Sequence, residues 1–287
     1  MKIDLHTHTL ASDGSFTPTE LVTLARSCGV GLLALTDHDV VSGCAEAALA
    51  CEREGIVFVP GIEVSSLWNG KTIHVVGLGV RYTDGRIEAT FGDVGEKRVR
   101  RGKAIGRRFE ALGISGAYEG ALRYCRHPDA LGRVHFARWL FSERYVSSYQ
   151  EAFDKYLKEG GPAFVSAVWP SVPRAVEIIL ENGGIAVLAH PGRYRLSPEH
   201  PLEELIDDFE AAGGRGIEVS SGSQRAECDA MLAVIAKERG LWASLGSDFH
   251  SLDGGRPRPG EERKLPPGLD AVWHHIPGLP DRDWDLL

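Results

Sequence analysis

Cysteine is scarce in this sequence, and the cysteines that occur form no obvious pairs. The chain has five of them in 287 residues, an odd number, and none stands in a C-x-x-C motif. Disulfide frameworks and thiolate metal sites both need grouped cysteines, so this pattern argues against either kind of site. We therefore expect reduced, packed cysteines and a cytoplasmic protein.

Long apolar segments are also missing. The longest apolar stretches, "VGLLAL" and "GIAVLA", have the length of strands, whereas a membrane helix needs roughly 18 apolar residues in succession. The N-terminus carries Asp4 and His6 where a signal peptide would have its apolar core. The composition, 43% hydrophobic and 25% charged, is typical of a globular protein. We expect no association with a membrane and no obligate protein partner.

Negative charge dominates the chain except in one segment. Residues 86–160 contain 15 Lys and Arg against 10 Asp and Glu, a net charge of +5, while the rest of the chain has −13. Within that segment, residues 97–108 contain seven basic residues and no acidic one. An acidic body suits metal ligands, and a basic segment suits an anion, although a solvated helix face gives the same pattern.

Strand-like and helix-like segments alternate on both sides of the basic segment. This order predicts a parallel sheet or barrel. Thr17, Pro18 and Glu20 mark the first helix with a capping box, and Gly29 ends it. The predicted strands are residues 2–8, 30–39, 56–66, 72–80, 185–190, 216–221 and 241–250, and the predicted helices are 17–29, 42–55, 172–184, 202–214 and 226–240.

The basic segment has a different pattern. Residues 96–113, 132–141 and 148–160 each predict a helix, and no convincing strand lies between them. We therefore predict a barrel formed by residues 1–85 and 161–287, interrupted by a helical insert at residues 86–160 that caps a substrate site. The segment after His250 is rich in glycine and proline and is predicted to be a loop.

Polar residues collect where the predicted strands end. His6 and His8, and also Asp248 and His250, are two residues apart, so each pair points the same way on a strand. In a parallel barrel all these strand ends meet on one face. Imidazole and carboxylate groups without thiolate suit Zn, Mn, Fe or Co, and at about three or four ligands per ion the set suffices for two or three ions. The candidate ligands are His6, His8, His38, Glu63, His74, His190, Asp248 and His250, whereas His127, His200, His274 and His275 are expected to have no such role.

Several motifs occur in order along the chain outside the insert. They are "DLHTHT", "SDG", "ALTDHD", "PGIEVS", "HVVGLG", "AVLAHPGRY" and "GSDFH". Together they resemble the PHP (polymerase and histidinol phosphatase) family, a branch of the amidohydrolase-like metal hydrolases. The resemblance implies an α/β fold, a distorted (β/α)7 TIM-like barrel, with a trinuclear metal centre.

The resemblance also implies how the ligands are shared. His6, His8, Glu63 and Asp248 would hold one ion, Asp13, His38 and His250 a second, and Glu63, His74 and His190 a third. Asp13, His38, His190 and Asp248 would act in catalysis through the ions, without a separate side-chain nucleophile. Asp13 stands where many family members have a histidine, and this harder oxygen ligand favours Mn or Fe over Zn. Asp37 and Asp39 are expected to orient the ligands.

Motifs in the insert and directly after it resemble one subgroup of the PHP family in particular. "GRVHFARWL", "FDKYLKEGGPAFV" and "GGIAVLAHPGRY" resemble the PHP subgroup that acts on 3′,5′-nucleoside bisphosphates such as pAp, some members of which also trim the 5′ ends of short RNAs. The implied reaction is hydrolysis of the 3′-phosphate by a metal-activated hydroxide, which leaves a nucleoside 5′-monophosphate.

Such a substrate needs contacts for its second phosphate. Basic side chains bind phosphate well, arginine through two parallel hydrogen bonds. The candidates are Arg100, Arg101, Lys103, Arg133, His135 and Arg193, while Phe136 and Trp139 would either stack on a base or pack in a core.

Other functions remain open. One is a 5′–3′ exonuclease on short RNA or DNA, although an isoelectric point near 5.8 argues against long polymers. Another is a phosphatase of histidinol phosphate or another sugar phosphate. A metal-binding module without activity is disfavoured, because no expected ligand position is missing.

Overall fold

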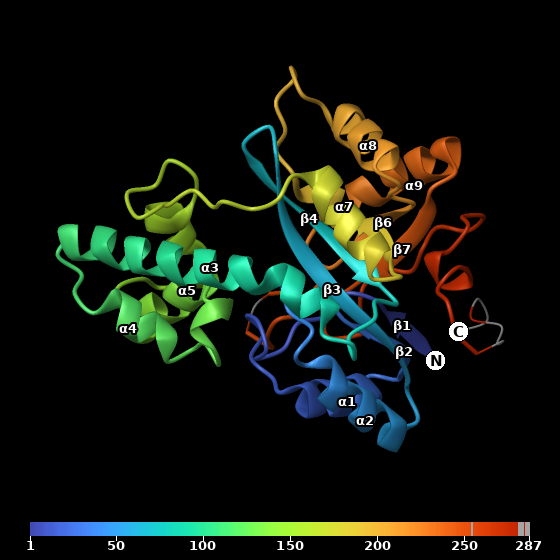
Figure 1. The fold of residues 1–287 in the computed structure, drawn as a ribbon, viewed down its shortest axis with the longest axis horizontal. Coiled ribbons are helices and arrows are strands. Elements are labelled where there is room, and N and C mark those ends of the chain that lie inside the picture. Colours follow the sequence, from blue (N-terminus) through green and yellow to red (C-terminus); the bar gives the residue numbers. More distant parts are fainter. Residues whose placement is uncertain (254, 281–283, 285–287) are drawn as a thin grey trace.

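The barrel expected from the sequence is present. The computed structural model describes residues 1–253, 255–280 and 284, and these include seven strands that form one sheet in chain order (Figure 1). The sheet nearly closes where the Asp248 amide donates to the His6 carbonyl (2.8 Å) and Thr7 bridges to Phe249. The strands are β1 (Lys2–Asp4), β2 (Val30–Leu35), β3 (Val57–Trp68), β4 (Lys71–Leu78), β5 (Ile185–Leu188), β6 (Gly216–Ser221) and β7 (Trp242–Gly246).

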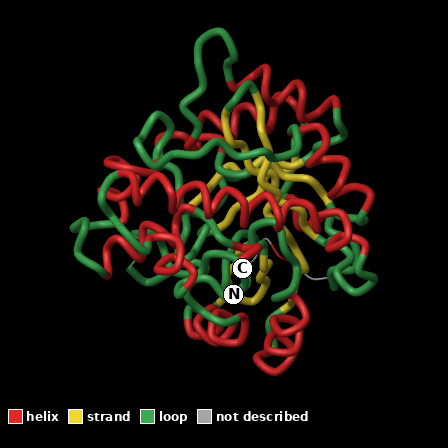
Figure 2. The backbone as a smooth tube through the Cα atoms, turned by 60° about the vertical axis from the view of Figure 1, so that its left-hand side comes forward, coloured by secondary structure: helices red, strands yellow, loops and turns green. Residues whose placement is uncertain are grey.

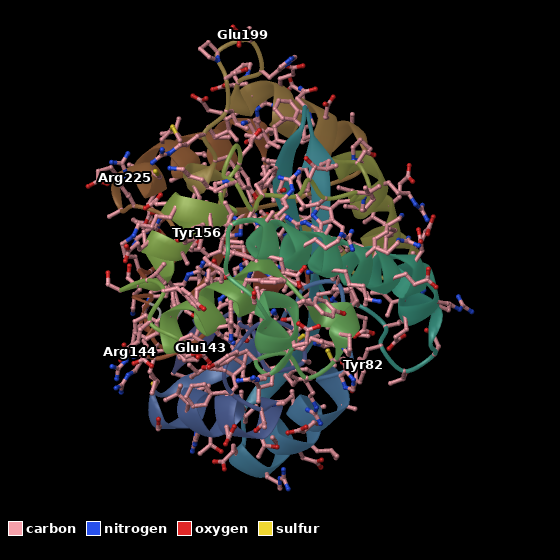
Figure 3. All side chains as sticks on the ribbon, turned by 90° about the vertical axis from the view of Figure 1, so that its left-hand side faces the viewer. Tyr82, Glu143, Arg144, Tyr156, Glu199 and Arg225 are labelled. Atoms are coloured by element: carbon pink, nitrogen blue, oxygen red, sulfur yellow. The ribbon has the colours of Figure 1, made fainter. Side chains whose placement is uncertain are left out.

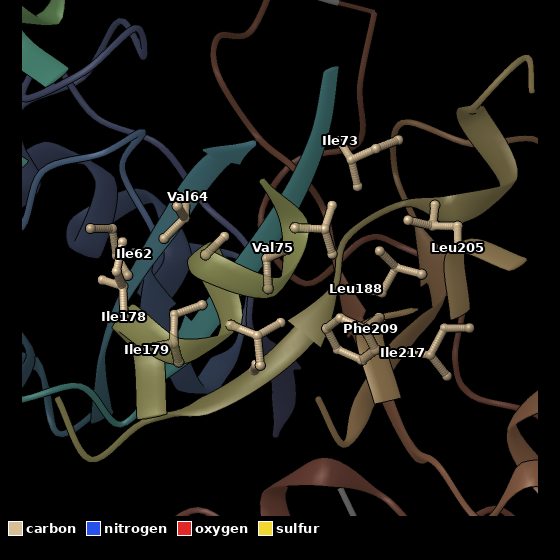
Figure 4. Close-up of a cluster of buried hydrophobic side chains, with 14 of the residues drawn as sticks. Ile62, Val64, Ile73, Val75, Ile178, Ile179, Leu188, Leu205, Phe209 and Ile217 are labelled. Carbon is tan, nitrogen blue, oxygen red and sulfur yellow. The ribbon is translucent and has the colours of Figure 1, made fainter. Parts of the chain in front are cut away.

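Helices surround the sheet (Figure 2). They are α1 (Pro18–Ser27), α2 (Cys44–Glu54), α7 (Val172–Glu181), α8 (Leu202–Ala211) and α9 (Glu227–Arg239). The capping box of Thr17 and Glu20 at the start of α1 is confirmed. Apolar side chains of β3 and β4, such as Val64 and Val75, pack against Ile178 and Ile179 of α7 in the largest core cluster (Figure 4). Within the described residues, none of the helices combines the length and apolar character that a membrane crossing requires.

One strand runs against the parallel order that the sequence predicted. β4 is antiparallel to both β3 and β5. Asn69 (φ 44°) and Gly70 (φ 76°) form the two-residue turn between β3 and β4, and Asn-Gly is the preferred sequence for such a hairpin turn. Because β4 is reversed, its first half lies at the end of the barrel where the parallel strands finish, and this places His74 there.

The helical insert has its own core beside the barrel (Figures 1 and 3). The three predicted helices are confirmed, but the first begins ten residues earlier than residue 96 and the last changes to a π-helix. Phe136 and Trp139 are buried in the core of the insert, so they pack there and do not stack on a base. The insert comprises α3 (Arg86–Ala111), α4 (Ala117–Leu122), η1 (Pro128–Ala130), α5 (Arg133–Ser142), α6 (Tyr149–Ala152) and the π-helix η2 (Phe153–Leu157).

The predicted loop after His250 is confirmed where it is described. A short 3-10 helix, η4 (Val272–His274), is the only helical or strand element longer than one residue in residues 251–253 and 255–280. The remainder of that predicted loop, residues 254, 281–283 and 285–287, lies outside the described residues.

Candidate metal centre

Glu63 of β3 lies at the centre of the predicted ligands. Its side chain is fully buried. Its carboxylate oxygens lie within 3.3 Å of ring nitrogens of His6, His8, His38, His74 and His190. The two oxygens divide these neighbours, because Oε1 faces His74 and His190 while Oε2 faces the other three histidines. A carboxylate placed in this way can bridge ions.

The remaining three predicted ligands, all carried by loops, complete the cluster. Asp248 Oδ1 lies 3.3 Å from His8 Nε2, and Asp13 Oδ1 lies 3.2 Å from His250 Nε2. All nine predicted ligands, including Asp13, are therefore brought together. Potential ligand atoms lie within 4.8 Å of one another in four overlapping groups, namely His8, Asp13, His38 and His250; His6, His8 and Asp248; His6, Glu63 and His190; and His38, Glu63 and His74.

Many of these atoms have no hydrogen-bond partner although they are buried. They are His6 Nε2, both ring nitrogens of His8, Asp13 Oδ1, His38 Nδ1, Glu63 Oε2 and His190 Nδ1, whereas Asp248 Oδ2 has an ion pair with Arg256. Buried polar atoms are nearly always paired in folded proteins, because an unpaired one costs free energy. Divalent ions bound by nitrogen and oxygen would pair them, so the donor set fits such ions.

Several ligands are held in protonation states that bind metal, whereas at His8 burial is outweighed by hydrogen bonds to Asp248 and Glu63, which raise its pKa to about 9. Burial lowers the pKa of His190 to about 3 and that of His250 to about 4, which keeps both rings neutral. Burial alone would raise the pKa of Glu63, but the surrounding histidines, His38 first, hold it well below its usual range. Neutral imidazole and ionised carboxylate are the forms that ligate metals.

The backbone of the ligand cluster has positive φ angles at three residues that are not glycine. His190 (φ 32°), Asp248 (φ 51°) and Asp39 (φ 57°) adopt positive φ, which non-glycine residues rarely do. Two of these residues are candidate ligands, and the third follows His38. Such backbone strain persists where the surrounding structure fixes it, commonly at functional sites.

Carboxylates behind the ligands hold them in place. Asp37 accepts hydrogen bonds from the Thr9 amide (2.7 Å) and the Ser12 hydroxyl (2.6 Å), and so fixes the loop between His8 and Asp13. This agrees with the orienting role predicted for Asp37. The loop between β1 and α1 is therefore tied to the end of β2.

Glu218 of β6 is a supporting residue that the sequence analysis missed. Its Oε1 lies 3.0 Å from His6 Nδ1, and its Oε2 accepts the His190 amide at 2.6 Å. A signal for it exists, because the hexapeptide "GIEVSS" occurs twice, at residues 61–66 and 216–221. The two copies place Glu63 and Glu218 at equivalent positions.

Arg98 of α3 is a second residue that the sequence analysis missed. Its guanidinium donates to Asp39 Oδ2 and to Ser65 Oγ (3.2 Å), and lies 4.8 Å from the centre of the Trp169 ring. The other Asp39 oxygen accepts the Ser65 amide (2.6 Å). Asp39 therefore connects the insert to the residue next to His38.

Two arginines of the insert face the ligands without a carboxylate partner. Arg101 donates to the Val165 carbonyl (2.9 Å) and Arg133 to the Leu157 carbonyl (3.2 Å). Neither has a salt bridge to any residue the structure describes. Burial and then the charges of Arg133 and Arg98 lower the pKa of Arg101 to about 9. Uncompensated positive charge of this kind attracts anions.

Seven of the nine candidate ligands, all but His6 and His8, and these arginines line one cavity of about 130 Å³. Three predicted phosphate-binding residues, Arg101, Arg133 and Arg193, belong to its lining. Arg256, which the sequence analysis missed, also lines it and donates to the Asp248 carbonyl (2.6 Å).

The structure does not bring the other three predicted phosphate-binding residues to the cavity. Arg100 and Lys103 are exposed, and Arg100 pairs with Asp93 and Glu96. On α3, positions 98 and 101 share one face, which turns Arg100 away. His135 is buried, and its Nδ1 accepts the Gly132 amide (2.9 Å) at the start of α5.

A seven-stranded α/β barrel with a buried cluster of nitrogen and oxygen ligands at one end defines a metal-dependent hydrolase of the amidohydrolase type. The chain belongs to the PHP domain family, whose model matches residues 4–163.

Known relatives resemble almost the whole chain. A protein of Chromobacterium violaceum named 3′,5′-nucleoside bisphosphate phosphatase is 44% identical over 96% of each chain. A 5′-3′ exoribonuclease of Haemophilus influenzae is 42% identical over 87% of this chain and 90% of its own. The solved structure of an amidohydrolase from Chromobacterium violaceum with bound sulfate superposes with a TM-score of 0.91, at 43% identity and 96% coverage of both chains.

Proposed function

We propose that this protein is a metal-dependent phosphatase that removes the 3′-phosphate of 3′,5′-nucleoside bisphosphates and leaves the nucleoside 5′-monophosphate. One observation carries the proposal: a single cavity is lined both by the ligand cluster and by Arg101 and Arg133, which have no carboxylate partner. A substrate with two phosphates satisfies both parts. The named activity of the Chromobacterium violaceum relative agrees with this reaction.

The nine candidate ligands would hold two or three divalent ions, manganese first, with iron or zinc as alternatives. Asp13, His38, His190 and Asp248 would serve catalysis through these ions. When bound, the ions lower the pKa of a coordinated water towards neutrality and stabilise charge on the phosphoryl oxygens. No side-chain nucleophile is required.

The remaining residues bind and orient the substrate. Arg101 and Arg133 would hold the 5′-phosphate, because guanidinium groups match phosphate oxygens in geometry and charge. Arg193 and Arg256 lie beside Asp248 and would offset charge on the 3′-phosphate. Residues 86–160 would act as a cap domain over a barrel of residues 1–85 and 161–287, and would exclude water from the site.

A substrate with one phosphate, such as histidinol phosphate, fits the cavity less well. It would leave Arg101 and Arg133 without a partner, and unpaired buried charge is costly.

The five free cysteines also agree with a protein kept in the reducing cytoplasm.

The decisive experiment compares substrates on the manganese-loaded protein. Values of kcat/KM are measured for pAp, 3′-AMP, 5′-AMP, histidinol phosphate and a short 5′-phosphorylated RNA. We expect pAp to exceed 3′-AMP at least about tenfold, because charged hydrogen bonds to the second phosphate each contribute about 1.5–3 kcal/mol. Equal rates for pAp and 3′-AMP would overturn the assignment of two phosphate sites.

A further inference from the structure

Arg138 of α5 reaches from the insert to a loop of the metal centre. The residue is 8% exposed, and its guanidinium donates to the carbonyls of Asp13 (2.7 Å) and Gly14 (3.0 Å). Hydrogen bonds from a charged donor are roughly twice as strong as those between neutral groups. The insert therefore holds the backbone of a candidate metal ligand directly.

The loop that carries Asp13 is compact. The Gly14 amide donates to the Thr9 carbonyl (2.8 Å), and a Cβ atom at Gly14 would lie 2.5 Å from the His8 carbonyl oxygen. Only glycine fits so close to another part of the backbone. Because the loop has little room to change shape, Arg138 fixes the Asp13 carboxylate together with the backbone that it contacts.

The same loop also holds His250. The amide and the hydroxyl of Ser15 both donate to the His250 carbonyl, at 2.8 and 3.0 Å. The side chains of Asp13 and His250 face each other at 3.2 Å. Two candidate ligands are thus positioned by one loop, and Arg138 ties that loop to the insert.

His38 is connected to the insert by a different route. Arg98 of α3 donates to the carboxylate of Asp39, the next residue along the chain. Two buried arginines of the insert therefore support neighbouring ligands from two sides. These ligands belong to one of the four ligand groups, which consists of His8, Asp13, His38 and His250.

Other candidate ligands are held from within the barrel. Glu218 of β6 faces His6 Nδ1 (3.0 Å) and accepts the His190 amide (2.6 Å). The His74 amide donates to the Tyr194 hydroxyl (2.8 Å). Among the described residues of the insert, none forms a hydrogen bond with these three histidines. The insert thus acts on one part of the cluster only.

We propose that Arg138 is a positioning residue of the metal centre, through which the insert controls the one ion that Asp13, His38 and His250 would bind. This inference rests on the proposed function, since it takes the presence of separate ions from it. The other ions depend on the barrel. Coupling is reciprocal, so this ion also strengthens the docking of the insert on the barrel.

One helix joins this metal site to the proposed phosphate site. α5 begins at Arg133, which would hold the 5′-phosphate, and it also carries Arg138. The two arginines are therefore fixed relative to each other by the hydrogen bonds of the helix. Docking of the insert places the phosphate site and the Asp13 loop together.

Stepwise removal of manganese from the loaded, full-length protein tests the inference. A competing chelator is added in increments, and the manganese that remains bound is counted. Arg138→Met is the test variant, because it keeps much of the apolar stem but has no donor, and Arg138→Lys keeps the charge. Arg107→Met, at an exposed site on α3, is the matched control. Asp13→Ala identifies the step, because it removes a ligand of the ion concerned.

We expect Arg138→Met to weaken one manganese-binding step about 10- to 100-fold, the usual loss when a residue behind a metal ligand is removed. The other steps, and all steps in Arg107→Met, should stay within about twofold. Arg138→Lys should lose less than Arg138→Met. Asp13→Ala/Arg138→Met should lose no more than Asp13→Ala alone, because both substitutions act on the same ion.

Three results would overturn the inference. Equal weakening of every step would show that Arg138 only stabilises the fold. Unchanged binding in Arg138→Met would show that it does not position the ligand. A further loss in the double variant, as large as that of Arg138→Met itself, would show that Arg138 acts on a different ion.

Amide hydrogen exchange gives a second measurement that leaves Arg138 in place. Manganese should slow exchange in residues 133–142 of the unaltered protein more than in Asp13→Ala, and equal protection in both would contradict the coupling. Neither measurement uses a substrate. Equal hydrolysis of pAp and 3′-AMP would therefore refute the proposed function alone, whereas a chain that binds no manganese would refute both.

Discussion

Arg98 of the insert and Asp39 of the barrel form a buried ion pair one residue away from the candidate ligand His38. Both side chains are at least nine-tenths buried. The pair joins two parts of the molecule that are far apart in the sequence, and the Trp169 ring covers the guanidinium. The position of the insert and the geometry of the ligand loop are therefore linked.

Arg98→Ala should destabilise the protein strongly. The substitution leaves the buried Asp39 carboxylate without its partner, and breaking a buried pair in this way costs about 3–5 kcal/mol. Urea denaturation measures the free energy of unfolding. Arg98→Ala/Asp39→Asn should recover part of the loss, because the unpaired charge is removed. Arg100→Ala, two residues along the same helix at an exposed site, serves as control, and a loss there as large as for Arg98→Ala would contradict the prediction.

Arg101→Ala and Arg133→Ala should raise KM for a bisphosphate much more than KM for a substrate with one phosphate. Each variant is expected to raise KM for pAp roughly 10- to 100-fold, the equivalent of one charge-assisted phosphate contact. KM for an aryl phosphate, which has no second phosphate, should stay within about twofold on the same grounds. Steady-state kinetics on both substrates gives the answer, and equal increases for the two would refute the phosphate site.

Glu218→Gln should weaken metal binding while the fold persists. The substitution keeps the shape of the side chain but removes the charge that faces His6 Nδ1. Loss of such a partner behind a metal ligand typically costs about 10- to 100-fold in affinity. Titration with a competing chelator measures the affinity, and Glu177→Gln, at an exposed position on α7, is the control. Unchanged affinity in Glu218→Gln would show that Glu218 does not support the ligands.

His135 should make the protein less stable as the pH falls. Burial lowers the pKa of His135 to about 4, whereas the unfolded chain has the ordinary value near 6.5. Between these values the unfolded state binds more protons, so stability is full above about pH 6.5 and declines towards pH 4. At pH 4.5 the titration of this one residue should lower the free energy of unfolding by about 2 kcal/mol.

The variant His135→Leu tests this contribution. It removes the titration, and it also loses the hydrogen bond from the Gly132 amide, which contributes about 1 kcal/mol. The variant should therefore be less stable than the unaltered protein at pH 7 and lose less stability between pH 7 and pH 4.5. Urea denaturation at both pH values measures this, and parallel losses in the two proteins would contradict the prediction.

Sequence patterns predicted most of the candidate metal centre, because side chains that follow the strands of a barrel meet on one face of it. His6 and His8 lie just beyond β1, which ends at Asp4, but both rings still face Glu63, and the barrel brings Asp248 to them. His74 was also expected, but for an incomplete reason, since only the Asn69–Gly70 turn and the reversal of β4 bring it to the right end.

The residues that the sequence analysis missed depend on packing between distant segments. A run of basic residues does not reveal which face of its helix meets the barrel, so Arg98 could not be told from Arg100. Arg256 lies in a segment that predicts only a loop. Glu218 could have been found, because its hexapeptide repeats the one that contains Glu63.

The identity of the metal can be tested at Asp13. Its Oδ1 lies 3.2 Å from His250 Nε2 in the group that also includes His8 and His38. A carboxylate is a harder ligand than an imidazole, so we expect manganese or iron in protein purified without added metal. Asp13→His should shift the content towards zinc. Elemental analysis of both proteins, with activity measured after loading each metal, decides the question. Stoichiometric zinc in the unaltered protein, as its most active form, would contradict the prediction, whereas more zinc in Asp13→His alone would support it.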